Sequence, residues 1–146
     1  MIRARARFAD PFSGMSGAEK KWAQILTASK LGASFVYLVP CQVHTWRPQA
    51  VTFHLAKGTS YRPDFQVIRM DGLIEYQEIK QEHRLSRKDR AAGRKSSPST
   101  WRPSARVKFK AAAERHPEFL WVALELQLDG SWKRTESEDL FKRTAS

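Results

Sequence analysis

Alternating apolar and polar residues predict strands in the middle of the chain. The run from 64 to 70 alternates and then stops at Asp71-Gly72, a dipeptide that favours tight turns. A second run, 73–80, is rich in β-branched and aromatic residues. Together these two runs predict a β-hairpin over residues 61–81.

Apolar residues spaced three and four apart predict a helix on each side of this hairpin. In the first helix, 16–30, Ser16 is followed three residues later by Glu19, which is a capping-box pattern. Its predicted buried stripe is Ala18, Trp22, Ile25, Leu26 and Ser29. The second helix, 104–116, has Ser104 as its predicted N-cap and a proline directly after its end. Its predicted buried stripe is Ala105, Phe109, Ala112 and Ala113.

The remaining apolar runs complete an α/β pattern. A long apolar run at 118–128 predicts a buried strand, reached from the hairpin through the second helix as a parallel crossover. The chain after the Asp129-Gly130 turn is expected to fray. Shorter runs predict strands at 34–39, 42–46 and 50–56, with turns at 46–48 and 57–59. The fold class predicted is α/β, with a central mixed β-sheet flanked by helices.

Composition narrows the class of partner. The 146 residues are 41% hydrophobic, which suits one domain, 1–146, and the net charge is +11. This charge indicates a polyanion, and nucleic acid rather than a membrane, because no amphipathic anchor, lipidation motif or spanning apolar run is found. A single cysteine, Cys41, excludes an internal disulfide. No secretory signal is recognised, so a cytoplasmic location is expected.

Positive charge is concentrated in one part of the chain. Residues 81–116 hold eleven Lys or Arg and three Asp or Glu, and 81–103 reads as a basic flexible loop. A basic N-terminal arm is expected at 1–12. Within the basic loop, Trp101 either stacks on an exposed base or packs the loop back onto the domain. The predicted nucleic-acid contacts are Arg84, Arg87, Lys88, Arg94, Lys95, Arg102, Arg106, Lys108 and Lys110.

The hairpin carries a candidate catalytic cluster. Side chains alternate along a strand, so Glu78 and Lys80 project from the same face. If the loop has three residues and Gly72 takes a positive φ, Asp64 lies directly opposite Glu78, with Cβ atoms about 5 Å apart. A two-residue turn would instead place Asp64 opposite Ile79. The cluster therefore depends on the hairpin register.

Two carboxylates and a lysine on one sheet face suit metal-assisted phosphodiester cleavage. Mg²⁺ prefers oxygen ligands and is held by one or two carboxylates together with water and substrate phosphate. Such a metal stabilises charge on the phosphate and lowers the pKa of a bound water. The lysine is suited to orienting that water or steadying the developing charge.

These residues resemble a known nuclease motif. Pro63-Asp64, followed after thirteen residues by Glu78-Ile79-Lys80, is similar to the PD-(D/E)xK motif. The wider frame resembles small phage endonucleases of the phage-type Holliday junction resolvase and endonuclease I group. The resemblance implies a restriction-endonuclease-like fold, a homodimer, and Mg²⁺-dependent cleavage of branched DNA that leaves 5′-phosphate and 3′-hydroxyl ends. It also implies a phage or prophage protein that acts in the host cell.

The resemblance also assigns roles to residues. Asp64, Glu78 and the carbonyl of Ile79 would bind Mg²⁺, for which Mn²⁺ substitutes, and Lys80 would position or activate the attacking water. A helix before the sheet supplies a third carboxylate in this family, and Glu19 is the acid available on the first helix. The capping box competes with this role for the same side chain.

Other interpretations of the sequence stay open. A basic protein that binds nucleic acid without catalysis would also show this charge distribution, and the acidic hairpin would then be structural. A sequence-specific restriction-type nuclease is a third possibility. His44 and His54 match no metal-binding spacing and are expected to be ordinary strand residues.

Overall fold

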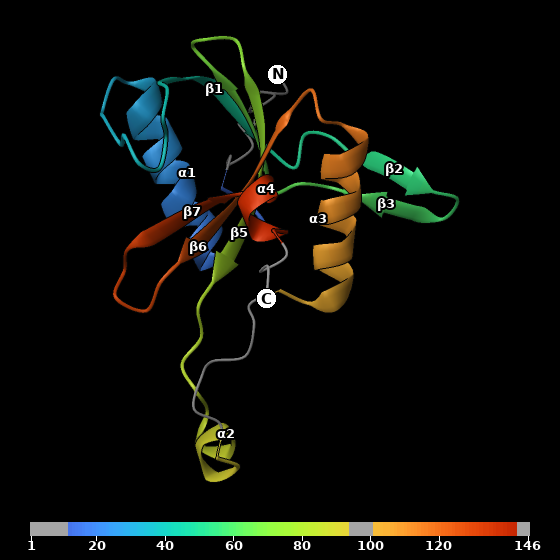
Figure 1. Cartoon of the computed structure of the whole chain (residues 1–146). Helices are drawn as coiled ribbons and strands as arrows, with labels where there is room; N and C mark the ends of the chain where they lie inside the picture. The colour runs from blue at the N-terminus through green and yellow to red at the C-terminus, as the bar shows by residue number, and fades with distance from the viewer. Residues whose placement is uncertain (1–11, 94–100, 143–146) are drawn as a thin grey trace, which may run out of the picture.

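A mixed five-stranded sheet forms the centre of the computed structural model, which describes residues 12–93 and 101–142 (Figure 1). The strand order is β1-β4-β5-β6-β7, and the neighbours β5 and β6 are parallel whereas the other pairs are antiparallel. The predicted α/β class, with a mixed sheet flanked by helices, is confirmed. The strands are β1 Val43–Pro48, β4 Phe65–Arg69, β5 Ile74–Gln81, β6 Leu120–Leu126 and β7 Trp132–Glu136.

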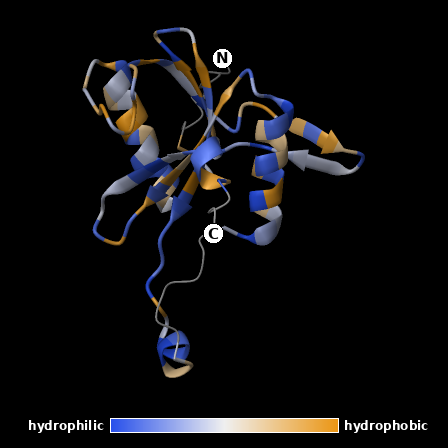
Figure 2. Ribbon diagram, in the orientation of Figure 1, coloured by the Kyte–Doolittle hydropathy of each residue, from blue (hydrophilic) through white to orange (hydrophobic). Residues whose placement is uncertain are grey.

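One long helix lies on each side of the sheet (Figure 1). Helix α1, Gly17–Lys30, packs with Phe65 and Val67 of β4 in a first apolar cluster. Helix α3, Pro103–Arg115, places Phe109 in a second cluster with Tyr76 and Trp121. In β5, Ile79 belongs to the first cluster and Tyr76 to the second, so apolar residues line both faces of the sheet. Figure 2 shows hydrophobic residues along the strands of the sheet.

Smaller elements surround this core. A two-stranded hairpin, β2 Phe53–Ala56 and β3 Thr59–Tyr61, forms a separate sheet that projects beyond α3 (Figure 1). Helix α2, Arg87–Ala91, lies on an extension away from the body, inside the stretch expected to be a loop. Helix α4, Ser137–Leu140, follows β7. None of the helices in the described parts of the chain is long and apolar enough to cross a bilayer.

The predicted start of α1 is confirmed, and that of α3 is wrong. Ser16 accepts a hydrogen bond from the Glu19 amide at 3.2 Å, while the Glu19 carboxylate accepts one from the Ser16 amide at 3.4 Å. In α3 the N-cap is Arg102 rather than Ser104, and it makes no side-chain capping bond. Pro103 explains the earlier start, because its fixed φ and missing N–H suit the first helical position.

Three strand predictions need correction. Residues 34–39 form a turn closed by a bridge between Phe35 and Val39 rather than a strand. Strand β1 continues through the predicted turn at 46–48, because a proline is tolerated at the end of an edge strand. The last segment does not fray, since Trp132 packs on Trp22 with ring centroids 5.1 Å apart. The parallel crossover from β5 through α3 to β6 is confirmed.

A buried polar network ties the first helix, the hairpin and the last strand together. Trp22 Nε1 donates to Gln77 Oε1 at 2.7 Å, and Gln77 Nε2 donates to Glu75 Oε1 at 3.3 Å. The Glu75 carboxylate, 1% exposed, also receives Arg134 at 2.7 Å and Arg69 at 3.3 Å. A buried carboxylate is costly unless it is paired, so the two arginines stabilise this arrangement.

Arg134→Met should lower the free energy of unfolding by about 3 kcal/mol, because it leaves the buried Glu75 carboxylate with Arg69 as its remaining ion-pair partner. Urea denaturation measures this difference. Lys133→Met, at the exposed neighbouring position, is the matched control and should stay within about 0.5 kcal/mol of the wild type. Equal unfolding midpoints for the two variants would contradict the importance of the ion pair.

Candidate active site

The hairpin register brings Asp64 and Glu78 together. Strand β4 pairs Phe65 with Gln77 and Val67 with Glu75, so the next position opposes Asp64 to Glu78. The backbone amide of Ile79 donates to Asp64 Oδ2 at 2.8 Å and holds the carboxylate beside the strand. The predicted three-residue register is confirmed.

Glu78 is held by two neighbours. The Tyr61 hydroxyl donates to Glu78 Oε2, and Lys80 Nζ lies 3.5 Å from Glu78 Oε1. Tyr61 was not predicted as a site residue, although a buried tyrosine usually requires a hydrogen-bond partner for its hydroxyl. Its position three residues before Asp64 was the available signal, but the strand pattern alone does not show where the hydroxyl points.

The electrostatics of the pair are unusual. Burial, followed by the charge of Glu78, raises the pKa of Asp64 to about 7, against the opposing effects of the Ile79 amide and Lys80. Burial also raises the pKa of Glu78, although hydrogen bonds from Tyr61 and Lys80 partly offset it. Burial and the Glu78 charge raise the pKa of Tyr61 well above its ordinary value, so its hydroxyl remains a donor. Both carboxyl groups therefore hold protons more tightly than exposed ones.

The sequence assigned two competing roles to Glu19, helix capping and catalysis, and the structure has an observation that bears on each. Its carboxylate closes the capping box of α1 by accepting from Ser16. After burial, the main cause, the charge of Glu19 also contributes to the raised pKa of Asp64 and Glu78. Glu19 therefore lies near enough to both acids of the hairpin for its charge to act on them, while its carboxylate also caps the helix.

Trp101 packs the end of the basic loop onto the domain. Its ring lies 5.2 Å from that of Phe109, and Lys80 Nζ lies 4.7 Å from the centroid of the Trp101 ring. The Lys80 ammonium group therefore has two neighbours, the Trp101 ring through a cation–π contact and the Glu78 carboxylate at 3.5 Å. The packing interpretation of Trp101 is confirmed, and stacking on a base stays a prediction.

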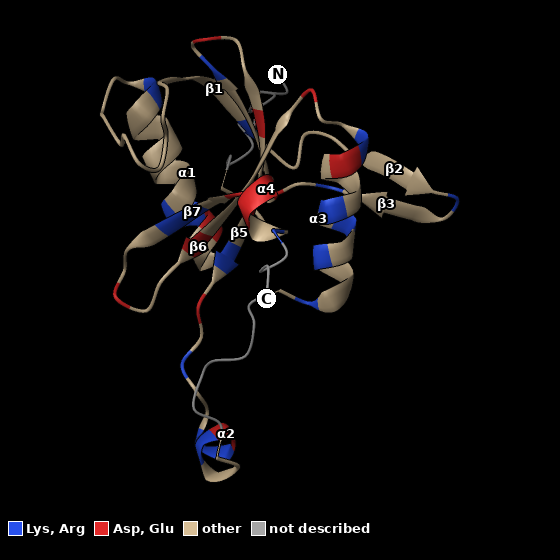
Figure 3. Cartoon of the chain, viewed as in Figure 1, with Lys and Arg blue, Asp and Glu red and all other residues tan. Residues whose placement is uncertain are grey.

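The predicted nucleic-acid contacts fall on two elements (Figure 3). Arg84 precedes α2, on the extension that begins after β5 ends at Gln81, and the helix itself carries Arg87 and Lys88. The others that the structure describes lie at the start of α3 or along it: Arg102, Arg106, Lys108 and Lys110. Arg94 and Lys95 lie outside the described residues.

Two of the α3 cations have neighbours within the protein. Arg106 donates to the Leu140 carbonyl at 3.4 Å, and its guanidinium lies 5.6 Å from the Phe141 ring centroid. Lys110 lies 4.0 Å from a carboxylate oxygen of Glu114 and 5.7 Å from the Phe141 ring. Contact with phosphate at these two positions would compete with the packing of α4, and it stays a prediction.

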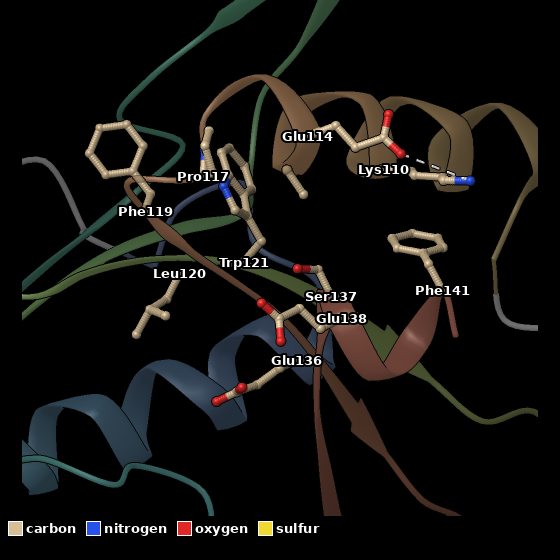
Figure 4. Close-up of a pocket in the computed structure, with 11 residues that line it drawn as sticks. Lys110, Glu114, Pro117, Phe119, Leu120, Trp121, Glu136, Ser137, Glu138 and Phe141 are labelled. Atoms are coloured by element: carbon tan, nitrogen blue, oxygen red, sulfur yellow. Dashed lines mark ion pairs between the residues drawn. The ribbon is translucent and has the colours of Figure 1, made fainter. Parts of the chain in front are cut away.

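A hollow of about 300 Å³ lies between α3, β6 and α4 (Figure 4). Lys110, Trp121, Glu138 and Phe141 are among its lining residues, and none of the predicted catalytic residues is. His44 lies on β1 and His54 on β2, as expected of strand histidines. Across the described residues, no three His, Cys, Asp or Glu side chains form a group that could hold a metal ion by themselves.

Comparison of the chain with models of known protein families, with curated proteins and with solved structures finds no match. The class that the fold defines is an α/β domain with a mixed sheet, and the hairpin adds a buried carboxylate, Glu78, and a partly buried one, Asp64, beside a lysine. Function must therefore be argued from these residues.

The raised pKa of Asp64 predicts how stability depends on pH without metal. Asp64 keeps its proton up to about pH 7 when folded but ionises near 3.8 when unfolded, so its contribution to stability falls as pH rises between these values. Asp64→Asn stays neutral and still accepts the Ile79 hydrogen bond. In EDTA it should melt close to the wild type at pH 4, where little of this contribution is yet lost, and about 3 °C or more above it at pH 8.

Glu138→Gln, at an exposed position, is the control for this melting experiment and should follow the wild type at both pH values. An Asp64→Asn protein whose melting temperature tracks that of the wild type from pH 4 to pH 8 would show that the pKa of Asp64 is not raised by burial beside a second carboxylate.

Proposed function

We propose that this protein is a metal-dependent endonuclease that hydrolyses phosphodiester bonds in DNA. The observation that carries the proposal is the face-to-face placement of Asp64 and Glu78, with Lys80 Nζ 3.5 Å from Glu78. A fold without a use for this pair would gain stability by replacing one carboxylate, since burial and the charge of Glu78 make ionisation of Asp64 costly. Costly ionisable clusters of this kind are characteristic of functional sites.

The donor set fits a hard divalent cation. Asp64 and Glu78 supply carboxylate oxygens, and a cation between two carboxylates relieves the repulsion that raises the pKa of Asp64. The proposed ligands are Asp64, Glu78 and the Ile79 carbonyl, with Mg²⁺ as the natural ion and Mn²⁺ as a substitute. When bound, the ion supplies positive charge at the attacked phosphate and makes a water molecule more acidic.

The proposed roles of Lys80 and Tyr61 follow from their positions beside Glu78. Lys80 lies between Glu78 and the Trp101 ring, where its ammonium group can orient the attacking water or steady charge on the phosphate. Tyr61 would hold one oxygen of Glu78 and thereby fix which oxygen is left for the cation and Lys80. Tyr61 is therefore a positioning residue, whereas Lys80 would touch the reacting groups.

The basic surface beside the hairpin supports DNA as the substrate. Lys80 is the second-last residue of β5, and the chain continues after Gln81 into the extension that carries Arg84, Arg87 and Lys88. Because these three cations come soon after Lys80 in the chain, they would contact phosphates next to the one that is cut. Branched DNA and a homodimer rest on the resemblance to junction-resolving nucleases.

A second candidate is a basic protein that binds nucleic acid without cutting it. The observation in its favour is that both oxygens of Glu78 already have partners, in Tyr61 and Lys80. A satisfied carboxylate of this kind can serve the fold alone.

Asp64→Asn, Glu78→Gln and Lys80→Ala should each lower the rate of Mg²⁺-dependent cleavage about 100-fold or more. The assay compares a four-way junction, a nicked duplex, a linear duplex and single-stranded DNA, each with Mg²⁺, Mn²⁺ or EDTA. Binding of the three variants to the junction in EDTA should stay within a few-fold of the wild type. Lys133→Ala, on the edge strand β7, is the control and should cut normally.

Cleavage of the junction in preference to the linear duplex would support the branched substrate. Equal cleavage of all four DNAs would retain the nuclease and exclude the structure preference. Tight binding by the wild type with no cleavage under either metal would establish the second candidate instead.

The two roles proposed for Glu19 separate in a matched pair of variants. Glu19→Gln keeps an acceptor for the Ser16 amide but removes the charge, so a catalytic Glu19 predicts at least about tenfold slower cleavage with little loss of stability. Ser16→Ala removes the cap and should cost about 1 kcal/mol of stability while cleavage continues. Normal cleavage by Glu19→Gln would limit this residue to capping.

A further inference from the structure

The β2–β3 hairpin has one buried face and one exposed face. Phe53, Leu55 and Tyr61 are buried, and they pack in the apolar cluster that also contains Phe109 of α3. Between them, His54 and Ser60 are exposed and lie opposite each other across the two strands. The buried face fixes the hairpin to the domain, so the exposed face is held out as a rigid surface.

The exposed face carries positive charge and no negative charge. The segment 49–63 contains Lys57 and Arg62 and no Asp or Glu. Lys57 lies in the turn at the tip, where Figure 3 shows a basic residue, and Arg62 lies at the base. Arg62 Nε donates to Thr52 Oγ1 at 3.1 Å, which braces the base across the two strands. The face is therefore complementary to a polyanion along its length.

The hairpin is directly connected to the candidate active site. Tyr61, the last residue of β3, donates its hydroxyl to Glu78, and Asp64 follows three residues later. At about 3.3 Å per residue the tip lies about 10 Å from the Tyr61 backbone, which corresponds to about three base pairs of a duplex. A duplex bound at the site would therefore extend along the hairpin.

We propose that the β2–β3 hairpin is a DNA-binding ribbon that enters the major groove of the duplex beside the cleaved phosphate. A two-stranded ribbon fits the major groove of B-form DNA, which is about 12 Å wide. The small polar side chain of Ser60 and the imidazole of His54 face outward where base edges would lie, and Lys57 and Arg62 flank them. The inference rests on the proposed function for the choice of DNA as ligand.

The major groove also distinguishes DNA from duplex RNA. In A-form RNA this groove is deep and narrow, and side chains do not enter it. A ribbon that acts in the groove should therefore contribute to binding of duplex DNA and contribute little to binding of an RNA duplex of the same sequence.

Binding of a 24-base-pair DNA duplex in EDTA tests the inference without any requirement for cleavage. Lys57→Ala should weaken binding about 5- to 10-fold at 0.1 M salt and reduce the slope of log K against log salt by about one. Ser60→Glu, which places a negative charge at the centre of the exposed face, should weaken binding at least as much. Lys133→Ala, which removes the same charge at an exposed strand position away from the hairpin, is the control and should leave both the affinity and the salt slope close to the wild type.

Because positions 57 and 60 are exposed, both variants should melt close to the wild-type temperature, so a loss of binding would not be caused by unfolding. Wild-type affinity and salt slope for both variants would overturn the proposal. An equal loss of affinity for DNA and RNA duplexes would also overturn it, because the contact would then not lie in the major groove. A loss specific to DNA would support the ribbon even if the wild type cuts no substrate, and in that case the proposed nuclease function alone would fail.

Discussion

The register of the β4–β5 hairpin is the constraint on which the rest of the site depends. The Arg69 amide donates to the Leu73 carbonyl at 2.9 Å, and Gly72 takes a φ of +86° that other residues rarely adopt. This three-residue loop places Asp64 opposite Glu78. A shift of one residue would oppose Asp64 to Ile79 and send every later side chain of the strand to the other face.

With this register, the two faces of β5 have different chemistry. On one face, Glu75 is buried with two arginines, and Gln77 bonds to Trp22, so polar groups are satisfied and join distant elements. On the other face, the buried Glu78 lies beside the partly buried carboxylate of Asp64, and burial raises the pKa of both groups. Departures from the most stable arrangement are expected at functional sites, and the second face is where such a departure occurs.

The sequence was sufficient to predict the elements that are determined by residues close together in the chain. Three such features were predicted: the capping box of α1, the hairpin register set by Gly72 and the parallel crossover to β6. Each depends on a cap, a turn or a spacing that nearby residues determine. Strand β7 was missed because its stability comes from partners far away in sequence, such as Trp22 against Trp132. In the site, the Asp64–Glu78 pair follows from register, whereas the contact of Tyr61 with Glu78 depends on the path of β3 around the sheet.

We propose that the hairpin register creates a site for a divalent cation, and a calorimetric titration with Mn²⁺ at pH 7.5 tests this site. We expect one saturable site in the wild type, with uptake accompanied by proton release because Asp64 has a pKa of about 7, and loss of that site in Asp64→Asn. No saturable binding by the wild type, or equal binding by the Asp64→Asn variant, would contradict it.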